Sequence, residues 1–283
     1  MARRKVLVLA NLMKDDAAGV AREIVAHLAT IGVDSVIHEF AGAPGPDPRL
    51  EGIDLVVSLG GDGTVLFAAR AAAPHGIPIL PFNLGRLGFI AGFGRNDWIV
   101  ALDCWLEGRL GLTARTMLSV SVKREDGIAA SFLALNDGVV SAQGIAKVIV
   151  LDIKIGGSII GSYRSDGVIV ATPTGSTAYN LAAGGPVLQP EMDAMILNPI
   201  CPFTLSNRAL VVPGSERIDV LVEEGKRTGV MLTVDGQETF TLMPGDKVGF
   251  THAPRRALIY TPERLGFYEV LREKLSWSGG PNA

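Results

Sequence analysis

Leu59-Gly60-Gly61-Asp62-Gly63-Thr64 decides the fold, because it sets a carboxylate among three glycines directly after an apolar run at residues 54–58. A short β-branched run that ends in glycines predicts a buried strand and a tight loop, and the Ala-rich residues 65–69 predict a helix from Thr64 onward. Glycine allows a bulky ligand to approach, and a helix N-terminus presents unpaired N–H groups and a partial positive charge. The turn therefore suits phosphate, with Asp62 holding a metal, orienting a hydroxyl or accepting its proton. The alternative is a glycine turn in which Asp62 only caps the helix.

The segments around this turn alternate between strand-like and helix-like patterns. We expect strands at residues 6–10, 33–37, 54–58 and 77–82, and helices at residues 15–31, 64–73 and 97–110. Such alternation predicts a Rossmann-like α/β domain whose parallel sheet is covered by helices and binds ligands beyond the carboxyl ends of its strands. A second glycine-rich turn, residues 83–89, follows the strand at 77–82. We therefore expect both turns at the same edge of the sheet.

The pattern changes to period-two alternation after about residue 108. We expect strands at residues 118–123, 131–140, 147–155, 168–172, 218–222, 230–234 and 246–251, and helices only at 176–183 and 263–275. These runs predict a mainly β, sandwich-like second domain. The predicted domains are residues 1–108 and 109–255, followed by a C-terminal segment, 256–283.

A second polar segment extends from Ser165 to Asn180. A buried strand leads into Thr172-Pro173-Thr174-Gly175, and a helix opens with two hydroxyl residues, which are good helix caps. Capping does not account for Tyr179, Asn180 or the upstream Asp166. An aromatic edge, hydroxyls and a carboxylate suit a purine and a ribose diol, because a carboxylate accepts two hydroxyl hydrogen bonds.

Asn136-Asp137-Gly138 is a third polar point, and a plain turn is its alternative interpretation. Elsewhere the sequence offers little chemistry: Cys104 and Cys201 lie far apart, and four scattered histidines give no metal-ligand spacing.

Composition excludes several classes of protein. The chain has 283 residues, 48% hydrophobic and 19% charged, which is typical of a packed globular protein. Its net charge of −3 argues against nucleic acid as the main partner. No apolar run reaches the roughly 18 residues that span a membrane. The short run at 6–10 is read as a first strand rather than a secretory signal, so we expect a cytoplasmic protein without a membrane partner.

Together these segments resemble the NAD kinase family. The resemblance rests on residues 60–64, 83–89, 136–137, 166–186 and 235–237 and on the terminal 271–277, in the family's order. The glycine turn alone is weak evidence, since lipid kinases and phosphofructokinases carry a similar one. The long segment 166–186 is specific.

The resemblance implies ATP-dependent phosphorylation of the adenosine ribose 2′-hydroxyl of NAD, with Mg²⁺ or another divalent cation on the phosphates and no metal ligands assigned to the chain. It implies that Asp62 is the catalytic base, that the chain is a homodimer or homotetramer, and that the C-terminal helix packs on the first domain. The implied contacts with ATP and NAD are Gly61, Asp62, Gly63, Asn83, Phe89, Asn136, Asp137, Lys147, Arg164, Asp166, Thr174, Thr177, Ala178, Tyr179, Asn180, Ala182 and Gln237.

The chain departs from the family pattern at two positions. Asp137 stands where many members have Glu, and Phe67 stands where many have Arg. Arg164 is placed near the phosphate path, with a solvated strand-end arginine as its alternative. Two other functions share parts of the pattern: a lipid kinase with the same glycine turn, which would need an apolar acceptor site, and a dinucleotide sensor in which Asp62 is only a cap.

Overall fold

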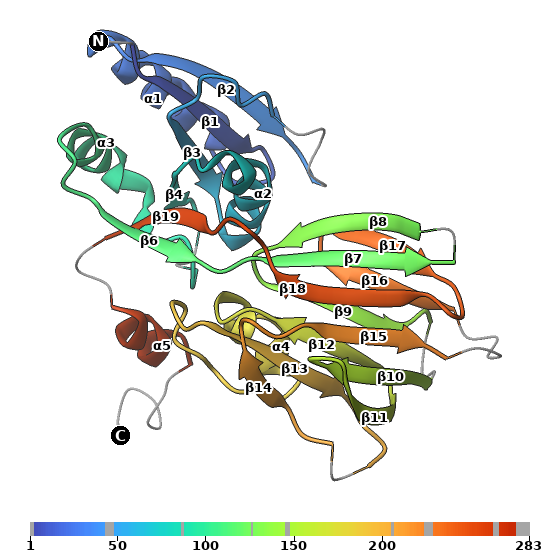
Figure 1. Ribbon diagram of the computed structural model, residues 1–283. Coiled ribbons are helices and arrows are strands. Elements are labelled where there is room, and N and C mark those ends of the chain that lie inside the picture. The colour runs from blue at the N-terminus through green and yellow to red at the C-terminus, as the bar shows by residue number, and fades with distance from the viewer. Residues whose placement is uncertain are drawn as a thin grey trace. The chain divides into compact units, whose positions relative to one another are not determined.

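The computed structural model describes residues 3–42, 48–85, 88–125, 127–144, 148–204, 207–223, 229–262 and 266–275. Internal contacts divide the chain into two units, Met1–Arg115 with Arg256–Ala283 and Thr116–Arg255. The predicted boundary at residue 108 precedes a strand that belongs to the first unit. The C-terminal segment belongs to that unit by its contacts, and Figure 1 shows its orange-red strand β19 beside β4 and β6.

The first unit is a mostly parallel sheet with helices on its faces. Its strand order is β2-β1-β3-β4-β19-β6, and β5 pairs with β4. The pairs among β1 to β5 and β4–β19 are parallel, and β6 is antiparallel to β19. The strands are β1 (Lys5–Asn11), β2 (Asp34–Phe40), β3 (Leu55–Gly60), β4 (Ile79–Asn83), β5 (Phe93–Gly94), β6 (Gly111–Arg115) and β19 (Ala257–Thr261).

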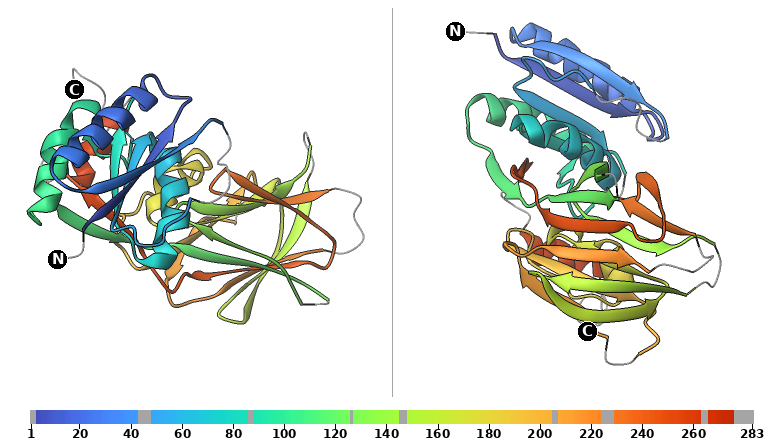
Figure 2. Two further views of the ribbon diagram at one scale, coloured as in Figure 1. Left: turned by 90° about the horizontal axis from the view of Figure 1, so that it is seen from above. Right: turned by 45° about the vertical axis from the view of Figure 1, so that its right-hand side comes forward.

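Helices cover this sheet because their apolar faces match the buried strands. These helices are α1 (Ala17–Thr30), α2 (Asp62–Ala72) and α3 (Trp98–Leu106), with 3₁₀ turns at Ala73–His75 and Arg95–Asp97. A further helix, α5 (Phe267–Leu275), ends the described chain. Helices α1 and α3 share one apolar cluster with alternate residues of β1, while α2 packs on β3 and β4 on the other face (Figure 2). Burying each such apolar side chain contributes about 1.5–3 kcal/mol.

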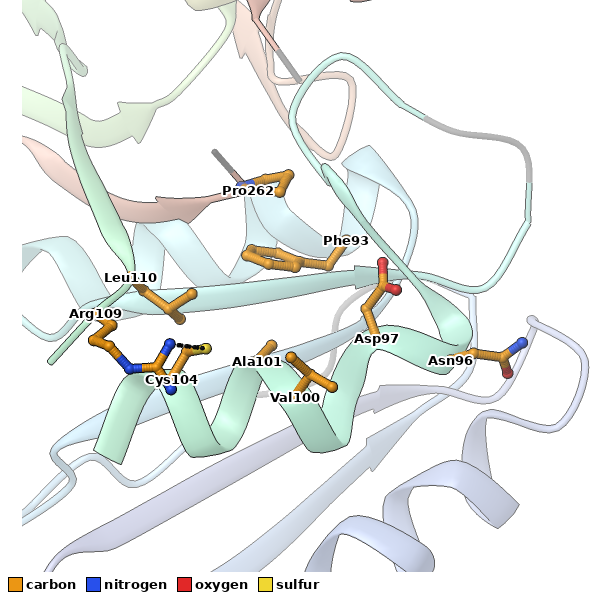
Figure 3. A pocket seen from close by; sticks show the side chains of 9 residues that line it. All are labelled: Phe93, Asn96, Asp97, Val100, Ala101, Cys104, Arg109, Leu110 and Pro262. Carbon is orange, nitrogen blue, oxygen red and sulfur yellow. Dashed lines mark hydrogen bonds between the residues drawn. The ribbon is translucent and has the colours of Figure 1, made fainter. Parts of the chain in front are cut away.

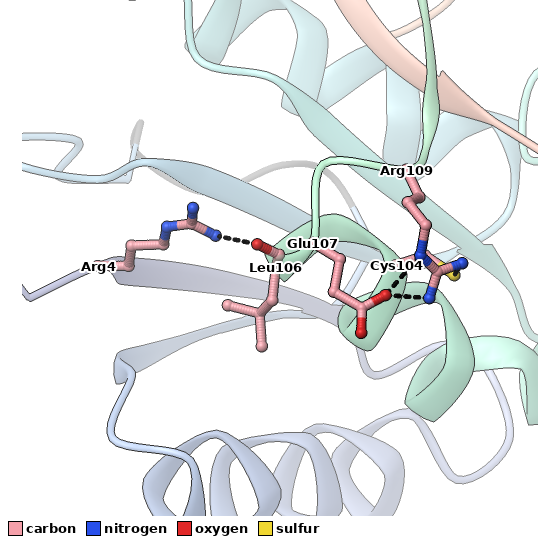
Figure 4. Close-up of polar contacts among 5 residues, drawn as sticks. All are labelled: Arg4, Cys104, Leu106, Glu107 and Arg109. Atoms are coloured by element: carbon pink, nitrogen blue, oxygen red, sulfur yellow. Dashed lines mark hydrogen bonds and ion pairs between the residues drawn. The ribbon is translucent and has the colours of Figure 1, made fainter.

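Polar contacts fix the C-terminal end of α3 (Figure 4). Arg4 donates a hydrogen bond to the Leu106 carbonyl at 3.3 Å, and Arg109 donates one to the Cys104 sulfur at 3.2 Å while it pairs with Glu107. Cations at this end of a helix satisfy carbonyls that lack intrahelical partners.

The second unit consists of two antiparallel sheets, β11-β10-β15-β18-β7-β8 and β14-β13-β12-β9-β16-β17. Inward-facing residues of both sheets form one apolar core, so the unit is a β-sandwich, as predicted. The first sheet contains β7 (Leu118–Arg124), β8 (Gly127–Ala134), β10 (Ile149–Ile155), β11 (Ser158–Ser165), β15 (Ile218–Val222) and β18 (Lys247–His252). The second contains β9 (Asp137–Ala142), β12 (Gly167–Ala171), β13 (Ala194–Ile200), β14 (Leu210–Pro213), β16 (Val230–Val234) and β17 (Glu238–Leu242).

Two expectations for this unit are corrected. The single run predicted at 131–140 is two strands in different sheets, because the chain crosses between β8 and β9 at residues 135–136. The helix predicted at 176–183 is a 3₁₀ turn, Thr174–Thr177, followed by the four-residue α4, Tyr179–Ala182. Ala178 interrupts it with a backbone ψ of −131°.

Candidate functional site

The glycine turn lies at the carboxyl edge of the first sheet, as the sequence predicts. Strand β3 ends at Gly60, opposite Asn83 at the end of β4, and α2 begins at Asp62, two residues before the expected Thr64. The Thr64 hydroxyl accepts a hydrogen bond of 3.3 Å from Asn11, the last residue of β1. Three neighbouring strands thus end in polar groups at one edge.

The second glycine-rich turn folds directly onto Asp62. Its carboxylate accepts three backbone hydrogen bonds, from Phe89 N to Oδ2 at 2.8 Å and from Ile90 N and Ala91 N to Oδ1 at 3.1 and 3.0 Å. Charge-assisted bonds of this kind are stronger than neutral ones. The two turns that the sequence singled out are therefore one structure, and Asp62 is more than a helix cap.

The neighbouring residues of the first unit support this turn. Asn83 is buried, and its Oδ1 accepts the Gly85 N–H at 2.8 Å. The ammonium of Lys274 on α5 lies 5.6 Å from the centre of the Phe89 ring, within cation–π range. The C-terminal helix thus contacts the turn that holds Asp62. Gly61 precedes α2 as its N-cap, and Gly63 is exposed.

Two residues near this turn were missed from the sequence. They are Asn11, described above, and Lys14, whose Cε lies 4.0 Å from the place where a Cβ on Gly61 would stand. A signal existed, because a polar residue that ends β1 must lie beside the end of β3 once the sheet is known to be parallel. Phe67, by contrast, is buried and packs on Phe40 at 5.2 Å between ring centres, which accounts for an apolar residue there.

The second unit holds a polar cluster around Asn136 and Asp137. The carboxylate of Asp235 accepts the backbone N–H groups of Leu135, Asn136 and Asp137 at 2.9, 2.8 and 3.1 Å. Asp235 adopts a φ of 51°, a left-handed conformation that Asp tolerates better than most residues. It was quoted within the family pattern but missed as a positioning residue.

The segment after β12 folds against this cluster. Thr172 N donates to the Asn136 carbonyl at 2.8 Å, and a Cβ on Gly175 would lie 2.1 Å from that carbonyl oxygen. Two buried polar atoms, Asn136 Oδ1 and Thr174 Oγ1, have no hydrogen-bond partner within the described residues. Buried polar atoms are normally paired, so these two atoms are open to a hydrogen bond from a ligand or a water molecule.

Asp137 is a buried carboxyl group in the same cluster. It is 4% exposed, and its carboxyl makes no hydrogen bond within the part of the chain that the structure describes. Burial, and then the negative charge of Asp235, raise its pKa to about 7. The carboxyl can thus change charge near neutrality without leaving its position.

The remaining predicted residues of this unit divide into exposed and engaged ones. Thr177 and Ala178 are half-buried, and Tyr179 and Ala182 of α4 are exposed. Asn180 is fully buried, and its side-chain amide donates to the carbonyls of Ser176 and Pro186, so a structural role accounts for it.

Other expected contacts lie elsewhere in the unit. Asp166 is exposed between β11 and β12, and Gln237 follows the Asp235–Gly236 turn. The guanidinium of Arg164 lies over the ring of Phe203, 5.3 Å from its centre. This contact is compatible with the alternative interpretation of Arg164 as a surface arginine. Lys147 lies outside the described residues.

A cavity of about 730 Å³ in the first unit is lined by neither Asp62 nor the Asn136–Asp137 cluster (Figure 3). It is bordered by α3 and the residues around it, namely Phe93, Asn96, Asp97, Val100, Ala101, Cys104, Arg109, Leu110 and Pro262. None of the residues predicted to bind ligand lines it, so size alone does not identify the site.

The described residues contain no group of three His, Cys, Asp or Glu side chains that could hold a metal. Within the same residues, every helix is too short or too polar to traverse a lipid bilayer.

Fold and site define a class of two-unit proteins: an α/β sheet that carries an aspartate at a glycine turn, and a β-sandwich that carries a buried polar cluster. Family models match both units, the ATP-NAD kinase N-terminal domain at residues 47–110 and the C-terminal domain at residues 135–261. The chain belongs to the NAD kinase family.

Curated relatives extend this match over nearly the whole chain. An NAD kinase of Treponema denticola is 43% identical over 98% of this chain and 97% of its own length. One of Acidobacterium capsulatum is 39% identical over 97% and 99%.

Solved structures of NAD and NADH kinases are also similar to this chain. Yeast NADH kinase complexed with NADH has a TM-score of 0.89 and 25% identity, covering 99% of this chain and 89% of its own. An NAD kinase from Archaeoglobus fulgidus in complex with ATP has a TM-score of 0.76 and 28% identity, covering 96% and 98%.

Proposed function

We propose that this protein is an NAD kinase that transfers the γ-phosphoryl group of ATP to the 2′-hydroxyl of the adenosine ribose of NAD, giving NADP and ADP. The observation that carries the proposal is that both family domains match the chain, one over the range that contains Asp62 and the other over the range that contains Asn136 and Asp137. The yeast and Archaeoglobus structures contain NADH and ATP, which supports both substrates.

In the proposed reaction the 2′-oxygen bonds to the γ-phosphorus, the bond from that phosphorus to the β,γ-bridging oxygen breaks, and ADP leaves. Asp62 orients the hydroxyl and receives its proton. Each carboxylate oxygen offers about two acceptor positions. Oδ1 already accepts two backbone hydrogen bonds and Oδ2 accepts one, so Oδ2 is the atom we assign to the substrate hydroxyl. A loose transition state asks little of the base, and late proton removal suffices.

We assign the dinucleotide mainly to the second unit, with Asn136 and Asp137 on the ribose and nicotinamide side and Thr177 to Tyr179 at the adenine. The unpartnered Asn136 Oδ1 and Thr174 Oγ1 support this assignment. The proposed contacts are completed by Gly61, Gly63, Asn83, Phe89, Lys147, Arg164, Asp166, Ala182 and Gln237.

We further propose that a divalent cation, Mg²⁺ in the simplest case, enters with the phosphates of ATP. A magnesium ion keeps several waters and is often held through substrate phosphates, so the proposal assigns it no ligands from the chain. Its contribution would be to neutralise phosphate charge.

We also propose a cytoplasmic homodimer or homotetramer. Strand β14 lies at the edge of its sheet and exposes Leu210 and Val211, and such apolar edges favour association. Light scattering on the purified protein measures the assembly, and a monomer at micromolar concentration would contradict it.

The decisive assay mixes purified protein with ATP, Mg²⁺ and NAD and measures NADP. NADP formation supports the proposal. Phosphorylation of a lipid acceptor instead, or tight NAD binding without product, would replace it with a lipid kinase or a sensor.

The variant Asp62→Asn tests the role of Asp62. It should retain NAD binding by calorimetry and lose about 10²-fold or more in kcat, the usual contribution of a positioned acid or base. Unchanged turnover would remove the base assignment.

A further inference from the structure

We propose that Gly88 is a positioning residue for Asp62. Because it lacks a side chain, residues 88–91 can close over the Asp62 carboxylate with three backbone N–H groups, and this leaves Oδ2 as the oxygen with room for a substrate hydroxyl. The inference rests on the proposed function for its catalytic meaning, although the contact itself can be tested without any enzyme assay.

The geometry at Gly88 is unusually restrictive. A Cβ built on this residue would lie 1.9 Å from Asp62 Oδ1, 2.4 Å from Cγ and 2.6 Å from Oδ2, far inside van der Waals contact. The φ angle of Gly88 is outside the left-handed region, so alanine would fit its backbone without strain. The glycine is therefore required by the carboxylate that lies against it, and not by the turn.

The three N–H donors orient the Asp62 carboxylate as well as stabilising its charge. Phe89 N binds Oδ2, while Ile90 N and Ala91 N bind Oδ1, so the plane of the carboxylate is fixed relative to α2. The Asp62 side chain is short, so a Cβ at position 88 that displaced its carboxylate would break all three hydrogen bonds together. A base turned away from its substrate is inactive even when its chemistry is unchanged.

Gly85 provides a matched control in the same turn. A Cβ on Gly85 would lie 3.8 Å from Asn83 Oδ1, an ordinary contact, and its φ is also outside the left-handed region. Its N–H bond to Asn83 would persist in alanine. The two glycines thus differ in their distance from a neighbouring side chain and not in backbone need.

The kinetic experiment compares Gly88→Ala and Gly85→Ala in NADP formation. We expect kcat of Gly88→Ala to fall about 10²-fold or more while KM for NAD and ATP changes about threefold or less, and Gly85→Ala to stay within about twofold of the wild type. Equal loss in both variants would overturn the proposal.

A double-mutant cycle separates positioning from general damage. In an Asp62→Asn background, Gly88→Ala should change kcat by about threefold or less, because the group through which it acts is already absent. Should Gly88→Ala cost the same large factor in both backgrounds, Gly88 acts by another route and the proposal fails.

Amide hydrogen exchange tests the contact even if Gly88→Ala does not fold or the wild type makes no NADP. The amides of Phe89, Ile90 and Ala91 should exchange slowly in the wild type and at least about tenfold faster in Asp62→Ala, whereas amides of β16 should not change. Equal exchange of the three amides in both proteins would show that the carboxylate does not hold them. Absence of NADP from the wild type with these amides protected would instead overturn the proposed function alone.

Discussion

Asp137 shows how one residue can link stability to pH. Its pKa rises from 3.8 to about 7 through burial and the charge of Asp235. Between these two values the unfolded chain has lost the proton and the folded chain keeps it, so the free energy of unfolding falls as pH rises. Below about pH 4 the group is neutral in both states and this penalty vanishes.

We therefore expect Asp137→Asn to become more stable than the wild type as pH rises from 4 to 8, with a gain on the order of 4 kcal/mol at pH 8. Urea unfolding at pH 5 and pH 8 measures the difference. A parallel pH dependence of Asp137→Asn and the wild type would contradict the assignment.

Lys14 is expected to contact the phosphates of ATP. It is exposed, and its side chain lies beside Gly61 at the N-terminus of α2, where a cation would meet phosphate oxygens. We expect Lys14→Ala to raise KM for ATP about tenfold, in line with the loss of one charged contact, and to leave KM for NAD nearly unchanged. Lys154→Ala, at an exposed position on β10, should change neither. An equal effect on both KM values would place Lys14 elsewhere in the mechanism.

Among single residues, the sequence predicted those whose chemistry is local. Asp62 follows from its glycines and its place after a buried strand, and the structure adds that its partners come from the next turn. Asp235 and Lys14 were missed because their roles depend on neighbours remote in sequence, which no period or spacing reveals. Asn180 was predicted to contact ligand, yet its amide is engaged within its own loop.

Among the elements, segments with clear alternation between turn residues were predictable, whatever their length. Strands at 218–222 and 230–234 match the expectation residue for residue, because alternation and turn residues define both ends. Strands β5, β6, β11, β13, β14, β17 and β19 were missed, and β8 and β9 were merged. The reason is physical: an uninterrupted apolar run does not record where the chain passes from one sheet to the other.

The loop after β12 packs closely against the Asn136 turn at Gly175. A Cβ on Gly175 would lie 2.1 Å from a backbone oxygen, which cannot rotate away. We expect Gly175→Ala to lower the free energy of unfolding by about 3 kcal/mol, the upper range for overpacking. Gly111→Ala, whose Cβ would lie 3.6 Å from the Thr261 oxygen, is the control and should cost under about 1 kcal/mol. Similar costs for both in thermal melts would disprove the close packing.

In the whole molecule, Asp62 and the Asn136–Asp137 cluster belong to different units of one chain. The division into an α/β and a β part was predictable from the change of period. The return of the C-terminal segment to the first unit was implied by family resemblance and not by pattern, because a lone amphipathic helix carries no record of its partner.

Removal of the divalent cation should affect activity but not the stability of the free protein. We expect EDTA to abolish NADP formation and to leave the thermal midpoint within about 1 °C, because a cation bound through ATP contributes nothing to the free protein. Excess Mg²⁺ should restore activity. A fall of the midpoint in EDTA would reveal a structural metal outside the groups that the described residues can form.

Strand β19 lies between β4 and β6 in the first sheet, although 141 residues of other elements separate it in sequence from β6. During synthesis on a ribosome, β4 is therefore made long before the strand that will cover its side. The β-sandwich is contiguous in sequence, so it can fold before β19 has been made. At that stage the first sheet still lacks a strand that pairs with β4. A released chain that ends at residue 256 should consequently be sensitive to protease in residues 1–115 and resistant in residues 116–255.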